Sequence, residues 1–349
     1  MARAKFGSAD WQAGLEQLRL IPDGSPNLAE ARFYEGSALL ELDRGAQAER
    51  TLHECIVLER DSVPARQKLV ELYLWEDRPL EARRLVWEVY NLVRPDNRVA
   101  ALDQLFRIDF AGLPLELRIA RLERFIANNP NDLDAVAALA TAYSTTENPL
   151  LIGRSVPMLR EVLEQYPNHP DCWAALAQLS FPENAEETMK LLDAWPEEHR
   201  DVQHLILLGT VQQEHKADYP KAAETFRQVL QSQPENWKVR YRYAACLRAM
   251  GETEKADRQL KIHTRISGAL NADAIGKLLQ ESATQPATAG FRHRMGELYE
   301  TVGRFKEARC WFEEALRIQP NHRPSQEALA RQTGRPDIEP VDSLSKPVK

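Results

Sequence analysis

The sequence predicts an all-α solenoid, a stack of helix pairs in which each pair packs mainly on its neighbours. One observation is composition: glycine is scarce at 15 residues, and alternating runs of valine, isoleucine and threonine are missing. Another is length, because 349 residues exceed one ordinary hydrophobic core whereas a solenoid grows by adding repeats. The third is a set of small, aromatic and proline residues at helix-turn-helix spacing near the C-terminus: Gly296, Tyr299, Gly303, Phe305, Ala308, Phe312, Ala315 and Pro320.

Each residue type in that set has a packing reason. Small side chains at Gly296 and Ala308 let two antiparallel helices approach closely, and Tyr299 and Phe312 fill the space beside them. Gly303 stands where the first helix must stop, because glycine accepts the left-handed backbone of a helix end.

The unit that runs from about residue 289 to 322 resembles a tetratricopeptide repeat, a helix pair of 34 residues. The same pattern, moved along the chain, indicates about eight such pairs, and the resemblance implies a right-handed α-solenoid with helical caps. The matches are strong at Gly36, Trp173 and Gly209. The third unit, Val99 to Asn131, is assigned by periodicity alone.

The pattern divides the chain into five parts. Residues 1–28 hold a capping helix, Ala9 to Ile21, and a linker; residues 29–266 hold repeats one to seven. Residues 267–288 interrupt the array with a short extra helix, Asp273 to Glu281, and a linker, which we expect to be the hinge. Residues 289–332 form the last repeat and a capping helix from Pro324, and residues 333–349 are expected to be disordered.

Charge, cysteine content and the lack of long apolar stretches limit the ligands and the cellular location that we expect. A net charge of -7 argues against general nucleic-acid binding. The four cysteines lie far apart without metal-ligand spacing, so we expect buried free thiols and no metal site. No stretch reaches the roughly 20 apolar residues of a bilayer span and no secretory signal is visible, which predicts a cytoplasmic location; an anchor upstream of Met1 stays open.

Catalytic and cofactor signatures are missing from the sequence. There is no GxxxxGK[ST], GxGxxG, HExxH, GxSxG or DxDxDG motif, so we expect neither an enzyme nor a cofactor. Glu214, His215 and Asp218 could suggest an acid-base site, but they fall at a turn between two helices and are interpreted as solvated polar residues.

The resemblance implies that the first helix of each pair lines a concave groove through repeat positions 2, 5, 9, 12 and 13. Carried over to this sequence, these positions hold Gln67, Glu71, Leu74 and Trp75; Lys238, Tyr241, Ala245 and Arg248; and His293, Glu297 and Glu300. Lys and Asn, which form a clamp for a peptide carboxylate in some family members, do not occupy the matching positions.

The segment from Trp237 to Arg248 interleaves basic and aromatic residues: Lys238, Arg240, Arg242 and Arg248 with Tyr241 and Tyr243. Such a face could bind an acidic peptide through charge-assisted hydrogen bonds and ring contacts. In the alternative interpretation Tyr243 belongs to the core and the arginines pair with neighbouring acids.

These features favour a non-catalytic scaffold or adaptor that binds partner peptides or domains through the groove. The partner-binding residues predicted for it are Lys238, Tyr241, Arg242, Arg248, His293, Glu297, Gln67, Glu71 and Trp75. A second hypothesis is an assembly or structural subunit of a larger, envelope-associated complex. The partner and the oligomeric state stay open.

Overall fold

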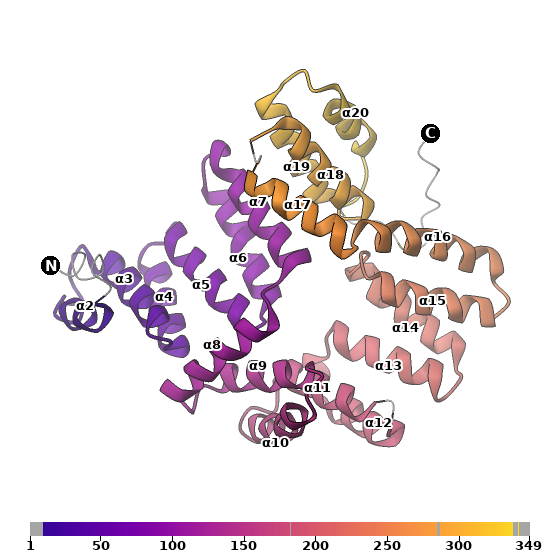
Figure 1. The fold of residues 1–349 in the computed structure, drawn as a ribbon, viewed down its shortest axis with the longest axis horizontal. Helices are drawn as coiled ribbons and strands as arrows, with labels where there is room; N and C mark the ends of the chain where they lie inside the picture. The colour runs from indigo at the N-terminus through magenta and orange to yellow at the C-terminus, as the bar shows by residue number, and fades with distance from the viewer. Residues whose placement is uncertain (1–9, 182, 285–286, 338–340, 342–349) are drawn as a thin grey trace. The chain divides into compact units, whose positions relative to one another are not determined.

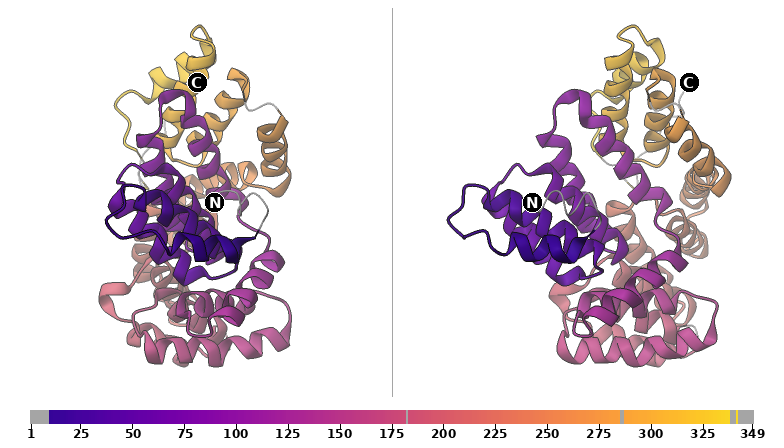
Figure 2. Two further views of the ribbon diagram at one scale, coloured as in Figure 1. Left: turned by 90° about the vertical axis from the view of Figure 1, so that its left-hand side faces the viewer. Right: turned by 60° about the vertical axis from the view of Figure 1, so that its left-hand side comes forward.

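The computed structural model describes residues 10–181, 183–284, 287–337 and 341. All regular structure in these residues is helical, with no strand, so the all-α prediction is confirmed (Figures 1 and 2). The chain divides into two compact units, residues 1–175 and 176–349. In the described part of the chain, no helix combines the length and the apolar character that crossing a bilayer requires.

The first unit begins with α2 (Trp11–Leu18), which packs on α3 and buries Leu15 and Leu18. Its further elements are α3 (Leu28–Glu41), α4 (Gly45–Leu58), α5 (Val63–Trp75), α6 (Pro79–Leu92), α7 (Arg98–Phe106), the π-helical turn η2 (Arg107–Ala111), α8 (Leu115–Asn128), α9 (Leu133–Ser144) and α10 (Pro149–Gln165). A 3-10 turn, η1 (Pro95–Asn97), precedes α7, and α11 (Pro170–Ser180) crosses the boundary between the units.

The second unit consists of α12 (Ala185–Ala194), the 3-10 turn η3 (Glu197–His199), α13 (Val202–Glu214), α14 (Tyr219–Ser232), α15 (Trp237–Ala249), α16 (Thr253–Ala269), α17 (Ala272–Thr284), α18 (Ala289–Thr301), α19 (Phe305–Ile318) and α20 (Arg323–Gln332). The helices that pack as antiparallel pairs in the two units are α3 with α4, α5 with α6, α9 with α10, α13 with α14, α15 with α16, and α18 with α19.

Glycine in the first helix of a pair sets how closely the second helix approaches. A Cβ atom added at Gly296 would lie 2.5 Å from Cδ1 and 2.8 Å from Cζ of Phe312. At Gly209 the added atom would lie 2.7 Å from Cε1 of Phe226. Both phenylalanine rings are fully buried. The rings therefore occupy the space that any larger residue would need.

A left-handed residue ends the first helix in five of the pairs. Glycine takes this position at Gly251 (φ 82) and Gly303 (φ 85). Asp43 (φ 55), Asp77 (φ 56) and Ala217 (φ 49) take it elsewhere, at a conformational cost that non-glycine residues accept when other contacts hold them.

The third repeat, assigned from the sequence to Val99 to Asn131, departs from the expected helix pair. α7 packs on α6, whereas α8 packs on α9 and α5 (Figure 1). In this repeat, Phe106 and Arg118 occupy the positions at which other repeats carry small residues such as Gly296 and Ala308. Because the Phe106 ring is fully buried, α8 has no small surface on α7 against which to close.

Arginines on α8 bind the turns of the first two repeats instead. Arg121 Nε lies 2.8 Å and Arg124 Nε 2.6 Å from the carboxylate of Asp43. Arg118 Nη1 lies 2.6 Å from Asp77 Oδ1. The left-handed aspartates that end α3 and α5 are thus also the ion-pair partners of α8.

Asp132 connects the start of α9 to the start of α4. Its carboxylate accepts from the backbone N–H of Ala135, at 3.2 Å, and from that of Ala46, at 3.0 Å. One buried side chain therefore caps two helices from different repeats, and the fourth repeat is anchored directly on the first.

The segment after the seventh repeat contains the helix α17, which spans the expected extra helix. Glu281 on α17 forms an ion pair with Arg294 on α18. The hinge expected here stays a prediction.

Described residues of the C-terminal tail form hydrogen bonds with the helices, and the disorder expected for residues 333–349 stays a prediction. The backbone N–H of Lys306 donates to the Asp337 carbonyl at 3.1 Å, and Gln259 Nε2 donates to the Val341 carbonyl at 3.0 Å. Val341 is buried in the apolar cluster around Phe226, and this burial gives the tail a reason to dock. Residues 338–340 and 342–349, also expected to be disordered, lie outside the described residues.

All four cysteines are free, and Cys55, Cys172 and Cys246 are fully buried, as predicted; Cys310 is half-buried. Burial raises the pKa of the Cys246 thiol to about 11 and also raises that of Cys172. These buried thiols therefore act as small apolar side chains.

We expect Gly296→Ala to destabilise the protein by about 1–3 kcal/mol, because the new methyl group overlaps the Phe312 ring. Gly290→Ala, on the same helix, is the matched control: its added Cβ meets only the Arg294 guanidinium at 3.6 Å, and alanine favours helix, so stability should be unchanged or rise. Urea unfolding followed by circular dichroism measures both. Equal effects of the two substitutions would contradict the packing role of Gly296.

Asp43→Asn keeps a residue type that tolerates the left-handed backbone but removes the charge that binds Arg121 and Arg124. We expect a loss of about 1 kcal/mol in unfolding free energy, measured in the same way. The exposed Asp61 supplies the control, since Asp61→Asn should change stability by less than about 0.5 kcal/mol. Equal stability of the Asp43 variant and the wild type would show that the α8 arginines do not hold the turn.

Candidate functional site

A cavity of about 980 Å³ opens on the second unit between two consecutive helix pairs. Its walls come from α13, the start of α14, α15 and α16: Gln213, Glu214, Tyr219, Trp237, Lys238, Tyr241, Arg242, Ala245, Ala249 and His263. α13 and α15 are the first helices of their pairs. The hollow therefore lies on the side where the repeat pattern placed the groove.

The two faces of α15 have different roles. Asn236 caps its start, with Oδ1 accepting from the Val239 N–H at 3.1 Å. Val239, Tyr243 and Leu247 are spaced by four residues on one face and are buried in the core. The helix consequently turns Tyr241 and Ala245 into the cavity.

Aromatic side chains form one wall of the cavity. The His263 ring lies 5.6 Å from the Trp237 ring and 5.5 Å from the Tyr241 ring, between centroids. His263 Nδ1 is 2.9 Å from the Trp237 carbonyl oxygen, which fixes the imidazole against α15. Tyr241 is 56% exposed, so much of the ring surface is available to a ligand.

Two cations face one carboxylate in the cavity. Arg242 Nη1 donates to Glu214 Oε1 at 2.5 Å and to Gln213 Oε1 at 3.1 Å. Lys238 Nζ lies 5.6 Å from the centre of the Trp237 ring and makes no ion pair within the described residues. The balance leaves one uncompensated positive charge beside the aromatic wall.

The structure brings three of the predicted residues together, Lys238, Tyr241 and Arg242, but not Arg248. Arg248 Nη2 lies 2.8 Å from Asp257 on α16, outside the cavity lining. Arg240 is buried and donates to Gln259 Oε1 at 2.6 Å, so its role is structural. The alternative interpretation holds for Tyr243, which is in the core, and for Arg242 and Arg248, which pair with acids. The printed side-chain partner of Arg240 is the amide of Gln259 and not an acid.

His293 and Glu297 lie in the last repeat and not in this cavity. His293 Nδ1 is 3.1 Å from Ser325 Oγ on α20, and its ring packs 5.3 Å from that of Phe312. Burial lowers the pKa of His293. The capping helix therefore covers much of the surface that His293 was expected to offer.

Gln67, Glu71 and Trp75 lie on α5 in the first unit. Gln67 is exposed, and Glu71 pairs with Lys68 at 2.9 Å. The guanidinium of Arg121 lies 5.1 Å from the centre of the Trp75 ring, because α8 packs on this part of α5. An element of the same chain thus fills the groove position at Trp75.

Sequence reasoning did not single out Gln213, Glu214 or His263 as lining residues. Gln213 and Glu214 occupy positions 12 and 13 of the sixth repeat. Applying the groove positions to that repeat would therefore have identified both residues. His263 belongs to a second helix, and no signal in the pattern points to it. Within the described residues, no group of three or more His, Cys, Asp or Glu side chains could hold a metal ion.

The fold and this cavity define a helical-repeat protein with a ligand-sized hollow on its first helices. Models of the tetratricopeptide repeat match residues 215–265 and 289–322. These two segments of the chain are tetratricopeptide repeats. Such repeats generally mediate protein–protein interaction, and the proteins that carry them are typically non-catalytic.

Solved structures with a similar arrangement include the repeat domain of P58(IPK), at 15% identity over 96% of this chain and 98% of that chain, with a TM-score of 0.33. A human IFIT1 dimer with m7Gppp-AAAA is 14% identical over 94% and 84% of the two chains, with a TM-score of 0.39. PilF of Pseudomonas aeruginosa is 16% identical over 59% and 92%, with a TM-score of 0.31. No curated protein matches the sequence.

Proposed function

We propose that this protein is a non-catalytic adaptor that binds an acidic segment of a partner protein in the cavity on α13–α16. One observation carries the proposal: Lys238, which makes no ion pair within the described residues, stands beside an exposed aromatic wall. An acidic peptide that also carries an apolar or aromatic side chain matches both features. The volume of about 980 Å³ suits several side chains of such a segment.

Each part of the cavity has a distinct task in this proposal. Lys238 pairs with a carboxylate of the partner, and charge attraction also speeds the encounter. Trp237 and Tyr241 pack against an apolar side chain, which contributes area that charge alone does not. Arg242 is shared: its guanidinium can bind the partner only in competition with Glu214, which already holds it at 2.5 Å.

The test uses the peptide acetyl-Asp-Glu-Phe-Asp-Glu-amide, with acetyl-Asn-Gln-Phe-Asn-Gln-amide as its neutral counterpart, in isothermal titration calorimetry. We expect Lys238→Glu to weaken binding of the acidic peptide about tenfold or more, because it reverses a charge that makes no ion pair within the described residues. Arg248→Glu makes the same kind of change on the same helix but outside the cavity, and binding should stay within about twofold.

Equal affinity of the acidic and neutral peptides would contradict the role of charge. Equal weakening by Lys238→Glu and Arg248→Glu would contradict the role of the cavity, because only the first residue lines it. Circular dichroism of both variants verifies that they are folded.

Glu214→Gln should strengthen binding of the acidic peptide about threefold to tenfold, since it releases Arg242 and removes a repelling carboxylate. The same calorimetric titration measures this gain. Glu197→Gln, at an exposed position in the same unit that does not line the cavity, should have no effect. Unchanged or weaker binding by the Glu214 variant would show that Arg242 does not take part.

A further inference from the structure

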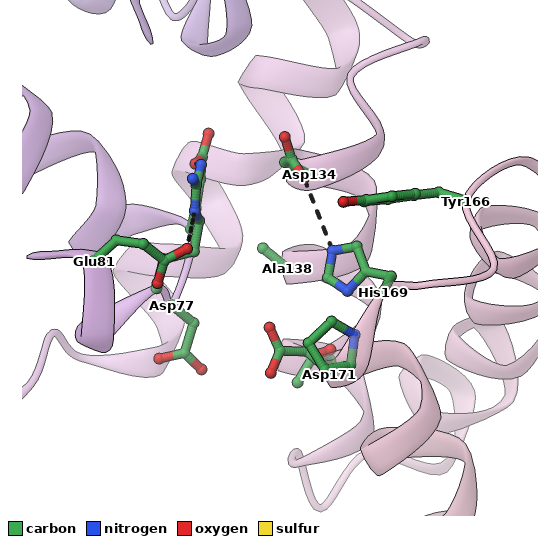
Figure 3. Close-up of a pocket in the computed structure, with 11 residues that line it drawn as sticks. Asp77, Glu81, Asp134, Ala138, Tyr166, His169 and Asp171 are labelled. Atoms are coloured by element: carbon green, nitrogen blue, oxygen red, sulfur yellow. Dashed lines mark hydrogen bonds and ion pairs between the residues drawn. The ribbon is translucent and has the colours of Figure 1, made fainter. Parts of the chain in front are cut away.

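A second cavity, of about 480 Å³, lies in the first unit and is lined by acidic side chains (Figure 3). It is formed by the turn between α5 and α6 with the start of α6, one face of α9, and the loop between α10 and α11 with the start of α11. Five carboxylates from these segments line it: Glu76, Asp77, Glu81, Asp134 and Asp171. None of the partner-binding residues predicted from the sequence lines it.

Arg78 is the only arginine or lysine in the described lining, and its guanidinium is already engaged. Its nitrogens lie 3.1 Å from Glu49, 2.9 Å from Glu76 and 3.1 Å from Glu81. Arg118, from α8, neutralises Asp77 at 2.6 Å. The five acidic side chains of the lining therefore outnumber these two arginines.

His169 does not add a positive charge to offset the acidic side chains of the cavity. Burial lowers the pKa of its imidazole, with the charge of Asp134 opposing that effect, so the ring is mainly neutral at pH 7. Its Nε2 faces Asp134 Oδ1 at 3.9 Å. A proton on Nε2 leaves Nδ1 as a hydrogen-bond acceptor.

Three buried polar atoms of the lining have no hydrogen-bond partner within the described residues: Nδ1 of His169, Oγ1 of Thr141 and Oε1 of Glu76. His169 is only 9% exposed, and Figure 3 shows its ring directed into the space between Asp134 and Asp171. A buried acceptor without a partner is costly, and a bound donor would remove that cost. This observation is independent of the carboxylates and also points to a ligand.

We propose that this cavity binds a guanidinium group, carried by an arginine of a polypeptide segment. The group brings a positive charge to an acidic cavity and N–H donors to His169 and the surrounding carboxylates. The proposal does not depend on the cavity of the second unit.

The distribution of the acceptors favours guanidinium over ammonium. Asp134, Asp171 and Glu81 come from three different segments and surround the space from several sides (Figure 3). The planar guanidinium presents five N–H donors in fixed directions, whereas an ammonium concentrates three donors at one point. Tyr166, 46% exposed at the cavity, supplies a ring face against which a guanidinium can stack.

Protonation of Glu76 offers a second way to detect binding of a cation in this cavity. Burial raises the pKa of this carboxyl to about 8; Arg78 opposes the shift, and Glu49 on α4 and Asp132 at the start of α9 add to it. Glu76 is therefore mostly protonated at pH 7, and a cation bound nearby lowers its pKa again. Binding should release protons, which appears as a dependence of the calorimetric heat on the ionisation enthalpy of the buffer.

The experiment is a titration of the full chain with acetyl-Gly-Arg-Gly-amide, its lysine and citrulline counterparts, and free L-arginine. Citrulline keeps the shape of arginine without the charge, so its peptide should bind at least about tenfold more weakly. The lysine peptide should also bind more weakly than the arginine peptide, and higher salt should weaken both. The arginine peptide should bind more tightly than free L-arginine.

The double variant Asp134→Asn, Asp171→Asn should lower affinity for the arginine peptide about tenfold, whereas Asp61→Asn should leave it unchanged. Circular dichroism verifies the fold, and His169→Ala provides a second variant, expected to weaken binding severalfold through the lost acceptor. Heat in phosphate and Tris buffers reports the proton release, which Glu76→Gln should abolish.

Several results would overturn the proposal: equal affinity for the arginine and citrulline peptides, unchanged affinity of the folded double variant, or no saturable binding of the arginine peptide at millimolar concentration. Equal or tighter binding of free L-arginine would contradict the polypeptide source of the group.

Discussion

The close contact between a glycine of one helix and a phenylalanine of the next is the constraint on which the repeats depend. At Gly296 and Gly209 the first helix carries no side chain, and the buried rings of Phe312 and Phe226 occupy the space left free. The contact fixes the spacing within a pair, and the left-handed residue after the first helix fixes where the second begins. Packing therefore commits one face of each of these first helices to the core.

In the third repeat the glycine–phenylalanine contact cannot form, and the helices pack differently. With Phe106 and Arg118 at the small positions, α8 packs on α5 and α9, and its arginines bind Asp43 and Asp77. Asp132 then joins α9 directly to α4. The turn between α5 and α6 meets α9 in this arrangement, and the acidic cavity lies where they meet.

Much of the fold could be predicted from the sequence because packing positions repeat. Gly36, Gly209 and Gly296 lie on first helices, as the pattern predicted, and Lys238 and Tyr241, which the groove positions grouped, line the same cavity. A single repeat position does not say what a distant segment will cover. Arg121 reaches Trp75 from α8, beyond α6 and α7 in the chain, and such tertiary contacts override local pattern. The acidic cavity draws on residues from Glu76 to Asp171, too far apart for any motif to show.

The sequence pattern is also insufficient to predict which charged side chains are free to bind a ligand. Arg240, Arg242 and Arg248 look alike in the sequence, but one is buried on Gln259, one faces the cavity and one pairs with Asp257. Their roles depend on the angle at which each leaves α15, which the core contacts of Val239 and Leu247 decide. Packing residues therefore determine which charges are available for binding.

We propose that the free face of the first helices α13 and α15 is the binding surface. Hydrogen–deuterium exchange of the full chain, with and without acetyl-Asp-Glu-Phe-Asp-Glu-amide, tests it most directly. We expect slower exchange in α13 and α15 on addition of the peptide, with α5 and α18 unchanged. Protection centred on α18 or α5, or no protection at a saturating peptide concentration, would contradict it.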